Sequence, residues 1–321
     1  MTDLGNDGAK VFALVGPTAA GKTAVALELA ARYPVALISI DSAQVYRGMD
    51  IGSAKPTRDE LARFPHALID IRDPSETYSV AEFLADADAA VRSALGAGRI
   101  PLLVGGTMLY LRAFREGLAA LPPVDAAVRE ALSAEADARG LAALHAELAA
   151  VDPQAAAGIH PNNPQRLLRA LEVWRQTGRP LSAWWAGQPA ADVAARLGVG
   201  FEAYAVVPDS RALLHQRIEQ RLTAMFAAGF MDEVRALRSR TDLHPGLPSL
   251  RAVGYRQAWA HLDGALAADA LAPAVLAATR QLARRQLTWL RSFGWVTAGS
   301  AVQIGSTLAA RLGDPGPAAG P

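Results

Sequence analysis

A segment near the N-terminus has the residue types and spacing of a phosphate-binding loop, G-x-x-x-x-G-K-[ST]. Its members are Gly16, Pro17, Thr18, Ala19, Ala20, Gly21, Lys22 and Thr23. The glycines let successive backbone N–H groups turn around phosphate oxygens, and the dipole of a following helix adds positive potential there. Lys22 adds a mobile charge, and the Thr23 hydroxyl can hold Mg²⁺. The segment predicts a site for a diphosphate or for a triphosphate such as ATP, and does not indicate the reaction.

A second candidate group is a carboxylate that follows the apolar run 35–40. Asp41 opens the sequence Asp-Ser-Ala-Gln-Val-Tyr. In a parallel sheet the carboxyl ends of the strands meet at one edge, so Asp41 is predicted to lie near the phosphate loop. There it can act as a general base or as a ligand of metal-bound water, and the sequence does not separate the two roles. The ordinary alternative is a capping Asp.

A third candidate is the sequence Gly105-Gly106-Thr107, which follows the apolar run 101–104. In NTP-hydrolysing enzymes an Asp that coordinates magnesium often stands at this place. Here the glycines permit a close backbone approach, and the Thr107 hydroxyl can reach a phosphate or bridging oxygen. The alternative is a plain glycine turn with a capping Thr. The missing carboxylate weakens an ATPase interpretation and leaves a small-molecule kinase open.

Arginines are concentrated in the C-terminal helical segments, and only three of the 32 basic residues are lysines. Planar guanidinium groups interleaved with aromatic rings suit a phosphate backbone and stacked bases. A solvated helix face and a biased composition are the competing explanations. The arginines in question are Arg217, Arg221, Arg251, Arg256, Arg280, Arg284, Arg285 and Arg291, with Trp289 among them.

The elements that must position these groups alternate in type. Apolar runs at 11–15, 35–40, 67–71 and 101–104 read as strands, and 79–95 reads as a helix between two of them. This alternation predicts an α/β fold with a mostly parallel sheet flanked by helices.

The pattern changes after residue 121. Helices are predicted at 124–139, 141–150 and 163–176, the last with Asn163 as N-cap and Pro164 at its first position. A strand returns at 204–207, and helices follow at 210–228, 231–238 and 272–290. The predicted organisation is a core of residues 10–120 and 202–300, an all-helical insertion of residues 121–201, and a disordered tail of residues 309–321.

Composition excludes several classes of protein. With 321 residues, a net charge of +1 and no cysteine, the chain has no disulfide, no cysteine zinc site and no thiol nucleophile. The six histidines have no metal-ligand spacing, so we interpret them as structural. No apolar signal core precedes the first strand, and no segment is long and apolar enough to span a bilayer, so we expect a cytoplasmic enzyme.

Nine segments, in order along the chain, closely resemble the bacterial tRNA dimethylallyltransferases, also called isopentenyl-diphosphate tRNA transferases. They are residues 16–23, 41–46, 49–56, His66 with 70–74, 103–110, 160–162 with 164–166, 229–230, 253–257 and 279–286. The departures are mild: Ala20 stands where family members commonly have Ser, and Gln44 where they often have a small apolar residue such as Leu.

The resemblance implies a core like that of the P-loop NTPases and a reaction. A dimethylallyl group would move from its diphosphate to N6 of the adenine just 3′ of the tRNA anticodon, with Mg²⁺. Dimethylallyl diphosphate, and not ATP, would occupy the phosphate loop. By similarity Asp41 accepts the proton of the attacking amine, Thr107 contacts the leaving diphosphate or the bridging oxygen, and Lys22, Thr23 and Arg217 neutralise the diphosphate.

The resemblance also implies partners. The helical insertion would grip the anticodon stem-loop, and we expect a monomer that binds no membrane. The residues implied to contact RNA are Asp41, Ser42, Ala43, Gln44, Thr107, Arg129, Gln165, Arg166, Leu167, Leu168, Arg169, Arg251, Gly254, Tyr255, Arg256, Arg284, Arg285 and Arg291.

Three rival hypotheses are consistent with parts of the sequence. One is a small-molecule or nucleoside kinase that uses ATP, and a second is an enzyme that prenylates free AMP or ATP. The third, from another class, is a nucleotide-gated RNA-binding protein without transfer chemistry. The helical insertion and the arginine sets favour RNA over a free nucleotide.

Overall fold

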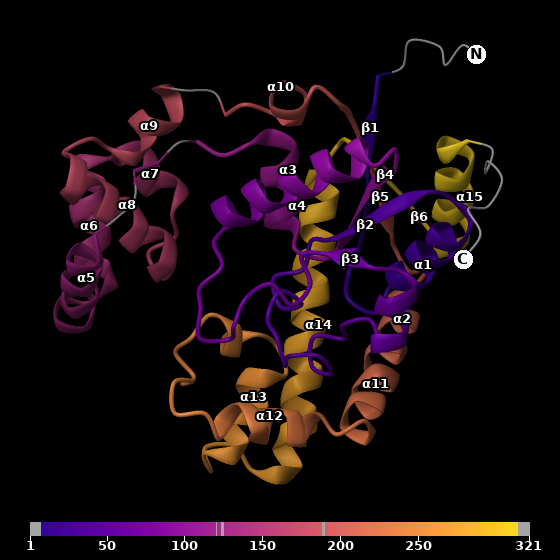
Figure 1. The fold of residues 1–321 in the computed structure, drawn as a ribbon. Helices are drawn as coiled ribbons and strands as arrows, with labels where there is room; N and C mark the ends of the chain where they lie inside the picture. Colours follow the sequence, from indigo (N-terminus) through magenta and orange to yellow (C-terminus); the bar gives the residue numbers. More distant parts are fainter. Residues whose placement is uncertain (1–7, 120, 123–124, 188–189, 314–321) are drawn as a thin grey trace. The chain divides into compact units, whose positions relative to one another are not determined.

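A single six-stranded parallel sheet forms the centre of the fold (Figure 1). The computed structural model describes residues 8–119, 121–122, 125–187 and 190–313. The strand order is β3-β2-β4-β1-β5-β6, which confirms the predicted parallel α/β core. The strands are β1 (Lys10–Val15), β2 (Val35–Ser39), β3 (His66–Ala67), β4 (Ile100–Gly105), β5 (Gly200–Val206) and β6 (Val296–Gly299).

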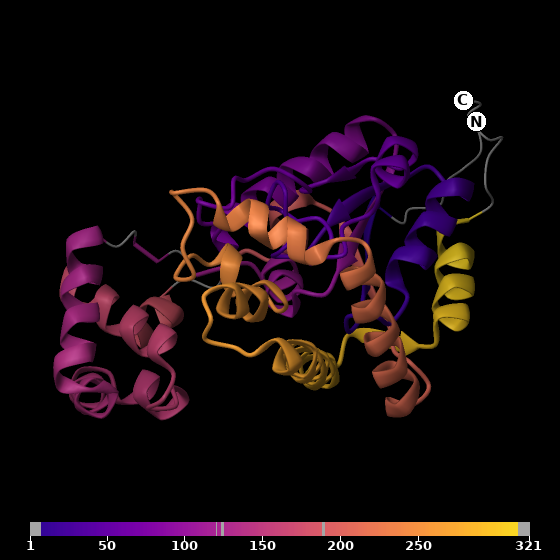
Figure 2. The same ribbon diagram turned by 90° about the horizontal axis from the view of Figure 1, so that it is seen from below.

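Helices cover both faces of the sheet because both faces are apolar. On one face α1 (Lys22–Arg32) and α15 (Ala301–Leu312) lie side by side (Figures 1 and 2). The other face packs against α3 (Val80–Gly96), α4 (Met108–Glu116) and the C-terminal end of α14 (Ala268–Ser292). The inner strands β1 and β4 are consequently almost completely buried, as expected for a doubly covered parallel sheet.

A third apolar cluster lies beside the segment that follows β2. It joins residues 45–51 to four helices: α11 (Arg211–Ala227), α12 (Phe230–Arg238), α13 (Tyr255–Leu262) and α14. Two short elements complete this part of the chain, α2 (Arg58–Arg63) and the 3₁₀ helix η1 (Ser249–Arg251). The cluster anchors the loop after β2, which carries Asp41.

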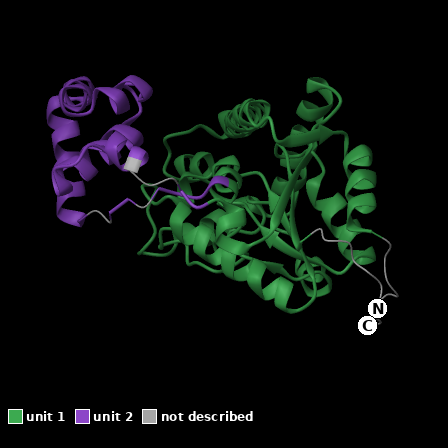
Figure 3. Cartoon of the chain, turned by 90° about the horizontal axis from the view of Figure 1, so that it is seen from above, with its two compact units in different colours: residues 1–115, 192–321 green, residues 116–191 purple. Residues whose placement is uncertain are grey.

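The helical insertion is a separate compact unit, residues 116–191, with its own apolar core (Figure 3, purple). Its helices are α5 (Ala126–Arg139), α6 (Leu141–Val151), α7 (Pro153–Gly158), α8 (Pro164–Thr177) and α9 (Leu181–Gly187). Asn163 caps α8, as predicted: its side chain accepts a hydrogen bond from the backbone N–H of Arg166 at 3.3 Å.

The boundaries of this unit differ from the predicted 121–201. Residues 192–201, including α10 (Val193–Leu197), belong to the larger unit. The reason is a largely buried ion pair: the Arg196 guanidinium contacts the Asp88 carboxylate of α3 at 2.9 Å and donates to the Phe114 carbonyl at 2.6 Å. The returning chain is thus fixed to the sheet's own helices before β5 begins.

Two other sequence predictions require correction. The strand predicted at 67–71 ends after Ala67, because Leu68 and Asp70 adopt left-handed backbone conformations with φ of 66° and 57°. The tail predicted at 309–321 is helical through Leu312, because α15 buries Ile304 and Leu308 against the sheet. Residues 314–321 lie outside the described part of the chain. None of the helices in the described segments is long and apolar enough to cross a membrane.

Candidate active site

The phosphate loop connects β1 to α1, and its geometry requires both glycines. A Cβ atom on Gly16 would lie 2.3 Å from the carbonyl oxygen of Val206 in β5, and the φ of Gly16 is 149°. Gly21 is the N-cap of α1 with φ of 101°, a left-handed conformation that side chains disfavour. The loop therefore places the positive end of α1 beside the carboxyl ends of the strands, where an anion is stabilised.

Lys22 is the first residue of α1 and lies partly buried against the loop. Its Nζ donates a hydrogen bond to the carbonyl of Pro17 at 2.8 Å. Burial lowers the pKa of Lys22 to about 8; the Asp41 carboxylate opposes this shift, and the Arg221 guanidinium adds to it. At neutral pH the side chain is mostly protonated and available to an anion.

Asp41 and Thr107 lie close together because β2 and β4 are neighbours in the sheet. The Asp41 carboxylate accepts a hydrogen bond from the backbone N–H of Ala43 at 2.9 Å. The Thr107 hydroxyl accepts from the N–H of Ser42 at 3.0 Å and donates to the Ser42 hydroxyl at 3.2 Å. A Cβ on Gly105 would lie 2.5 Å from the Ile40 carbonyl, so Gly105 permits this approach.

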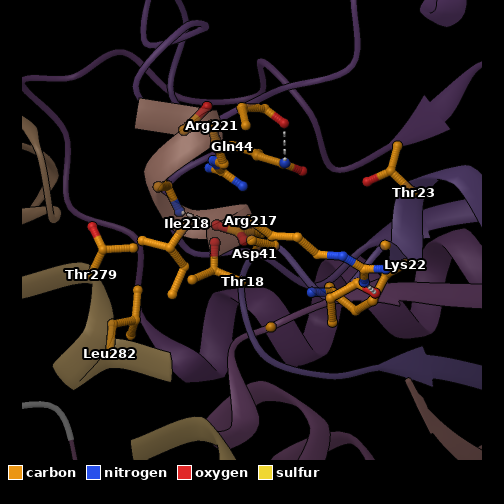
Figure 4. A pocket seen from close by; sticks show the side chains of 18 of the residues that line it. Thr18, Lys22, Thr23, Asp41, Gln44, Arg217, Ile218, Arg221, Thr279 and Leu282 are labelled. Atoms are coloured by element: carbon orange, nitrogen blue, oxygen red, sulfur yellow. Dashed lines mark hydrogen bonds between the residues drawn. The ribbon is translucent and has the colours of Figure 1, made fainter. Parts of the chain in front are cut away.

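A pocket of about 880 Å³ lies at this edge of the sheet. One side is polar and contains the phosphate loop, Asp41 and two arginines of α11 (Figure 4). Apolar side chains also line the pocket, and in Figure 4 Ile218 and Leu282 lie across it from Lys22 and Thr23, with Thr279 beside them. The apolar side chains come from α11, α14 and the segment before α13, and include Ile218, Leu222, Met225, Val253, Val275 and Leu282. The pocket can therefore hold a ligand that joins an anionic group to a hydrocarbon group.

Two arginines of α11 face this pocket one helical turn apart (Figure 4). The Arg217 guanidinium donates to the carbonyl of Ala20 in the phosphate loop at 3.2 Å. Arg221 also lines the pocket, and burial lowers the pKa of its guanidinium despite the opposing charge of Asp41. The sequence marked Arg221 only as a member of an arginine-rich face, and its i, i+4 spacing from Arg217 was the available signal.

The side chain of Gln44 is engaged within the protein. It accepts a hydrogen bond from the Ser39 hydroxyl at 3.0 Å and donates to the carbonyl of Ala54 at 3.2 Å. Gln44 thus ties the loop after β2 to the segment around Ala54. Its implied contact with RNA stays a prediction, as do those of its neighbours Ser42 and Ala43.

Most arginines predicted to contact RNA are exposed. In the larger unit these are Arg251, Arg256, Arg284, Arg285 and Arg291. In the helical unit Gln165, Arg166 and Arg129 are exposed, and Leu168 and Arg169 are partly buried. Arg129 and Arg169 both approach the buried Glu172 carboxylate, at 3.4 and 3.5 Å. Their shared carboxylate holds the two guanidinium groups on the same side of this unit.

Two predicted RNA contacts have side chains that the structure does not expose. Leu167 is completely buried in the core of the helical unit. Tyr255 is completely buried as well, and its hydroxyl donates to the Glu233 carboxylate at 2.6 Å. Gly254, the N-cap of α13, is also buried and has φ of 94°. In this structure these residues pack the core, and their contact with RNA stays a prediction.

Two positioning side chains were missed by sequence reasoning. Glu233 of α12 accepts hydrogen bonds from the backbone N–H groups of Asp50, Ile51 and Gly52 at 2.7–3.1 Å. Gln286 of α14 bridges the phosphate loop and the loop after β4. Their partners are backbone groups far away in the sequence, so the contacts themselves leave no residue pattern. Gln286 closes the 279–286 segment of the family resemblance, and that was the available signal for it.

The described residues contain no cluster of three or more His, Cys, Asp or Glu side chains that could hold a metal ion by themselves. Thr23 is exposed, and it lines the same pocket as Asp41. Mg²⁺ commonly binds through one or two protein oxygens together with substrate phosphates and waters. The donor set fits an ion that enters with a phosphorylated ligand.

Comparison with known proteins identifies the family. A sequence model described as IPP transferase matches residues 44–293. The chain is 57% identical over 282 residues to a tRNA dimethylallyltransferase of Chromohalobacter salexigens, with 88% of each chain covered.

Solved structures give the same result. The tRNA isopentenylpyrophosphate transferase of Bacillus halodurans is 36% identical with a TM-score of 0.66, and the match covers 94% of this chain and 96% of that one. The tRNA isopentenylpyrophosphate transferase of Staphylococcus epidermidis is 28% identical with a TM-score of 0.65, covering 95% and 99%. A eukaryotic dimethylallyltransferase acting on tRNA, 23% identical with a TM-score of 0.76 over 94% and 77% of the two chains, shares the fold. The chain belongs to the IPP transferase family.

Proposed function

We propose that this protein transfers a dimethylallyl group from dimethylallyl diphosphate to N6 of the adenine adjacent, on the 3′ side, to the anticodon of tRNA. The observation that carries the proposal is the two-sided pocket. A phosphate loop, Asp41 and two arginines stand on one side of it, and apolar side chains stand on the other. The names of relatives, including one that is 57% identical, agree with this chemistry.

The diphosphate binds to the backbone N–H groups of the phosphate loop and to the positive end of α1. Lys22 gives up its hydrogen bond to the Pro17 carbonyl and turns to the phosphate oxygens. Arg217, already at 3.2 Å from the loop carbonyl of Ala20, adds a second cation. These charges stabilise diphosphate as a leaving group, which is where negative charge develops during the reaction.

The dimethylallyl group occupies the apolar side of the pocket, beside Ile218 and Leu282 (Figure 4). This environment distinguishes a prenyl diphosphate from ATP, whose β- and γ-phosphates would be followed by a polar nucleoside. It also keeps water away from the carbon that reacts, so that the allylic group is transferred and not hydrolysed.

In the transfer step the adenine N6 attacks C1 of the dimethylallyl group. The C1–O bond to the diphosphate breaks, the N6–C1 bond forms, and the proton of N6 passes to the Asp41 carboxylate. The adenine amine is a poor nucleophile because its lone pair is delocalised into the ring, so a positioned base is needed. One Asp41 oxygen is held by the N–H of Ala43, which orients the carboxylate. Thr107 contacts the leaving diphosphate or the bridging oxygen.

The tRNA binds through its anticodon stem-loop. The exposed arginines of α13 and α14 meet the phosphate backbone in the larger unit, and Arg166 and its neighbours do so in the helical unit. The target adenine must unstack from its neighbouring bases to reach Asp41. The free energy of this unstacking is smallest in a single-stranded loop. The loop after β2, from Asp41 to Gln44, meets the extruded base.

We further propose that Mg²⁺ accompanies the diphosphate, with the Thr23 hydroxyl as its protein ligand. Thr23 is exposed in the pocket, as such a role requires. The ion would supply positive charge to the departing diphosphate. We also propose that the protein acts as a monomer in the cytoplasm, where its tRNA substrate is found.

Mass spectrometry of an anticodon stem-loop RNA tests the proposal. The RNA is incubated with the protein, Mg²⁺ and dimethylallyl diphosphate, and a parallel tube contains ATP instead. The proposal predicts a gain of one C5H8 unit with the diphosphate alone. No gain in the first tube together with consumption of ATP in the second would assign the phosphate loop to kinase chemistry. Binding of the stem-loop without any added mass would assign the protein to the RNA-binding class.

A further inference from the structure

Gln286 joins the two loops that carry the proposed reactive groups. Its Oε1 accepts a hydrogen bond from the backbone N–H of Thr18 in the phosphate loop at 2.9 Å. Its Nε2 donates to the carbonyl of Gly106, the residue before Thr107, at 2.9 Å. Only 8% of Gln286 is exposed. A single buried amide therefore holds the phosphate loop and the Thr107 loop together.

The fit around this amide is tight. A Cβ atom on Gly106 would lie 2.5 Å from the Nε2 of Gln286 and 3.4 Å from the carbonyl oxygen of Gly16. A buried amide needs both a donor and an acceptor as partners, and Thr18 and Gly106 supply them. Displacement of either loop relative to α14 would break one of the two bonds, so the position of α14 determines the distance between the loops.

The same helix presents cations to solvent immediately before Gln286. Arg284 and Arg285 are exposed, and they belong to the residues proposed to bind the tRNA backbone. The α14 helix is continuous from Ala268 to Ser292, so a shift of its exposed face moves Gln286 as well. RNA on one side of α14 and diphosphate on the other thus act on one rigid element.

We propose that Gln286 is a positioning residue that couples RNA binding on α14 to the geometry of the diphosphate site. The inference rests on the proposed function and deepens it. Bound stem-loop holds α14 in the position in which Gln286 orients the phosphate loop, so RNA tightens diphosphate binding. By linkage, diphosphate tightens RNA binding by the same factor. The phosphate loop keeps its second tether, from Arg217 to the Ala20 carbonyl, when the Gln286 contact is lost.

The test uses Gln286→Met, which keeps the length of the side chain and removes its donor and acceptor. The dissociation constant of inorganic pyrophosphate is measured with and without saturating anticodon stem-loop. For the unaltered protein we expect a smaller constant with RNA present. For Gln286→Met we expect the same dissociation constant with and without RNA. This constant should be about tenfold larger than that of the unaltered protein. Stem-loop affinity without pyrophosphate should stay unchanged, which a general loss of structure would not produce.

Gln216→Met is the matched control, because Gln216 is an exposed glutamine of α11 outside the pocket. It should retain the coupling. Equal coupling in Gln286→Met and the unaltered protein would overturn this inference and leave the proposed function in place. Absence of coupling in the unaltered protein would do the same. Failure of the unaltered protein to bind the stem-loop would overturn the proposed function itself and this inference with it.

A double-mutant cycle provides a second test that does not depend on the stability of Gln286→Met. Gly106→Ala pushes directly on the Gln286 amide, so alone it should reduce the coupling between RNA and pyrophosphate. In a Gln286→Ala background the clash is relieved, and Gly106→Ala should cause no further loss. Additive losses in the double variant would contradict the proposal.

Discussion

The hydroxyl of Thr107 accepts a hydrogen bond from the backbone N–H of Ser42 at 3.0 Å, so the loop after β4 holds the turn that begins with Asp41. The two loops meet because β4 lies between β1 and β2 in the sheet. The phosphate loop follows β1, on the other side of β4. The sheet order thus brings the proposed base and the proposed diphosphate site to adjacent positions from three separate parts of the chain.

Replacing Asp41 should affect the chemical step far more than RNA binding. Asp41→Asn keeps an oxygen that can accept from the Ala43 N–H and removes the base, so turnover should fall about 100-fold to 10,000-fold. Single-turnover rates at saturating RNA, together with the dissociation constant of the stem-loop, check this. A large loss of RNA binding with intact turnover at saturation would refute the assignment of Asp41 as base.

Thr107 should tolerate Ser and not Ala. Thr107→Ser keeps the hydroxyl that binds Ser42 and can reach the diphosphate, and its transfer rate should approach that of the unaltered protein. Thr107→Ala removes the hydroxyl and should lower the rate at least about tenfold. An unchanged rate in Thr107→Ala would reduce Thr107 to a structural part of the turn.

Diphosphate affinity should fall as the pH rises through about 8, the lowered pKa of Lys22 in the free protein. Below that pH the ammonium is charged and binds the anion, and above it the charge is lost. Pyrophosphate affinity is measured as a function of pH for the unaltered protein and for Lys22→Arg, which stays charged throughout. Pyrophosphate itself also titrates in this range, but its contribution is the same for the unaltered protein and for Lys22→Arg. Identical pH profiles for the two proteins would contradict the role of Lys22.

Shortening an apolar side chain of the pocket should weaken the prenyl contact alone. Leu282→Ala removes part of the apolar side, so the KM for dimethylallyl diphosphate should rise roughly 5-fold to 30-fold, equivalent to about 1–2 kcal/mol. Pyrophosphate has no hydrocarbon group and serves as the internal control, with unchanged affinity. If Leu282→Ala weakened the binding of dimethylallyl diphosphate and of pyrophosphate equally, the dimethylallyl group would not lie against Leu282.

Glu233 should matter for stability without touching the substrate. Its carboxylate accepts three backbone hydrogen bonds from residues 50–52 and one from the Tyr255 hydroxyl. In Glu233→Gln the negative charge is lost, and the new amide NH₂ group, itself a donor, faces the backbone N–H groups and the Tyr255 hydroxyl. The free energy of unfolding should therefore fall by about 1–3 kcal/mol. Denaturant unfolding measures this, with the exposed Glu219→Gln as control. Equal stability of the two variants would contradict the importance of this contact.

The sequence predicted the parts of the site that depend on local order along the chain. The phosphate loop, Asp41 and Thr107 each follow a short apolar run, and the strand–loop relationship alone brings them to one edge. The positions of Gln286 and Glu233 could not be predicted, since they bind backbone groups of Thr18, Gly106 and residues 50–52. Any residue type can supply such a group, so the partner leaves no mark in the sequence.

Some elements of the fold were also missed for physical reasons. The strand predicted at 67–71 has suitable residues, but Leu68 and Asp70 turn left-handed. Leu68 gives no sign of this, and Asp70 gives only a weak one, because Asp adopts a positive φ more often than most residues do. The strand β6 is only four residues long and half exposed, so it lacks the apolar run of the inner strands. The helix α15 follows it in an Ala- and Gly-containing segment, and is stabilised by packing against α1 and by the Ser300–Gln303 capping box.

The proposed reaction joins a dimethylallyl group to one particular adenine and releases one diphosphate. Two anticodon stem-loops are compared, one with adenine and one with guanine at the position 3′ of the anticodon, each with dimethylallyl diphosphate and Mg²⁺. Digestion to nucleosides followed by mass spectrometry, with a diphosphate assay on the same samples, should yield one N6-dimethylallyladenosine per diphosphate released from the adenine loop and neither product from the guanine loop. Modification of both loops, or diphosphate release without a modified nucleoside, would contradict the account.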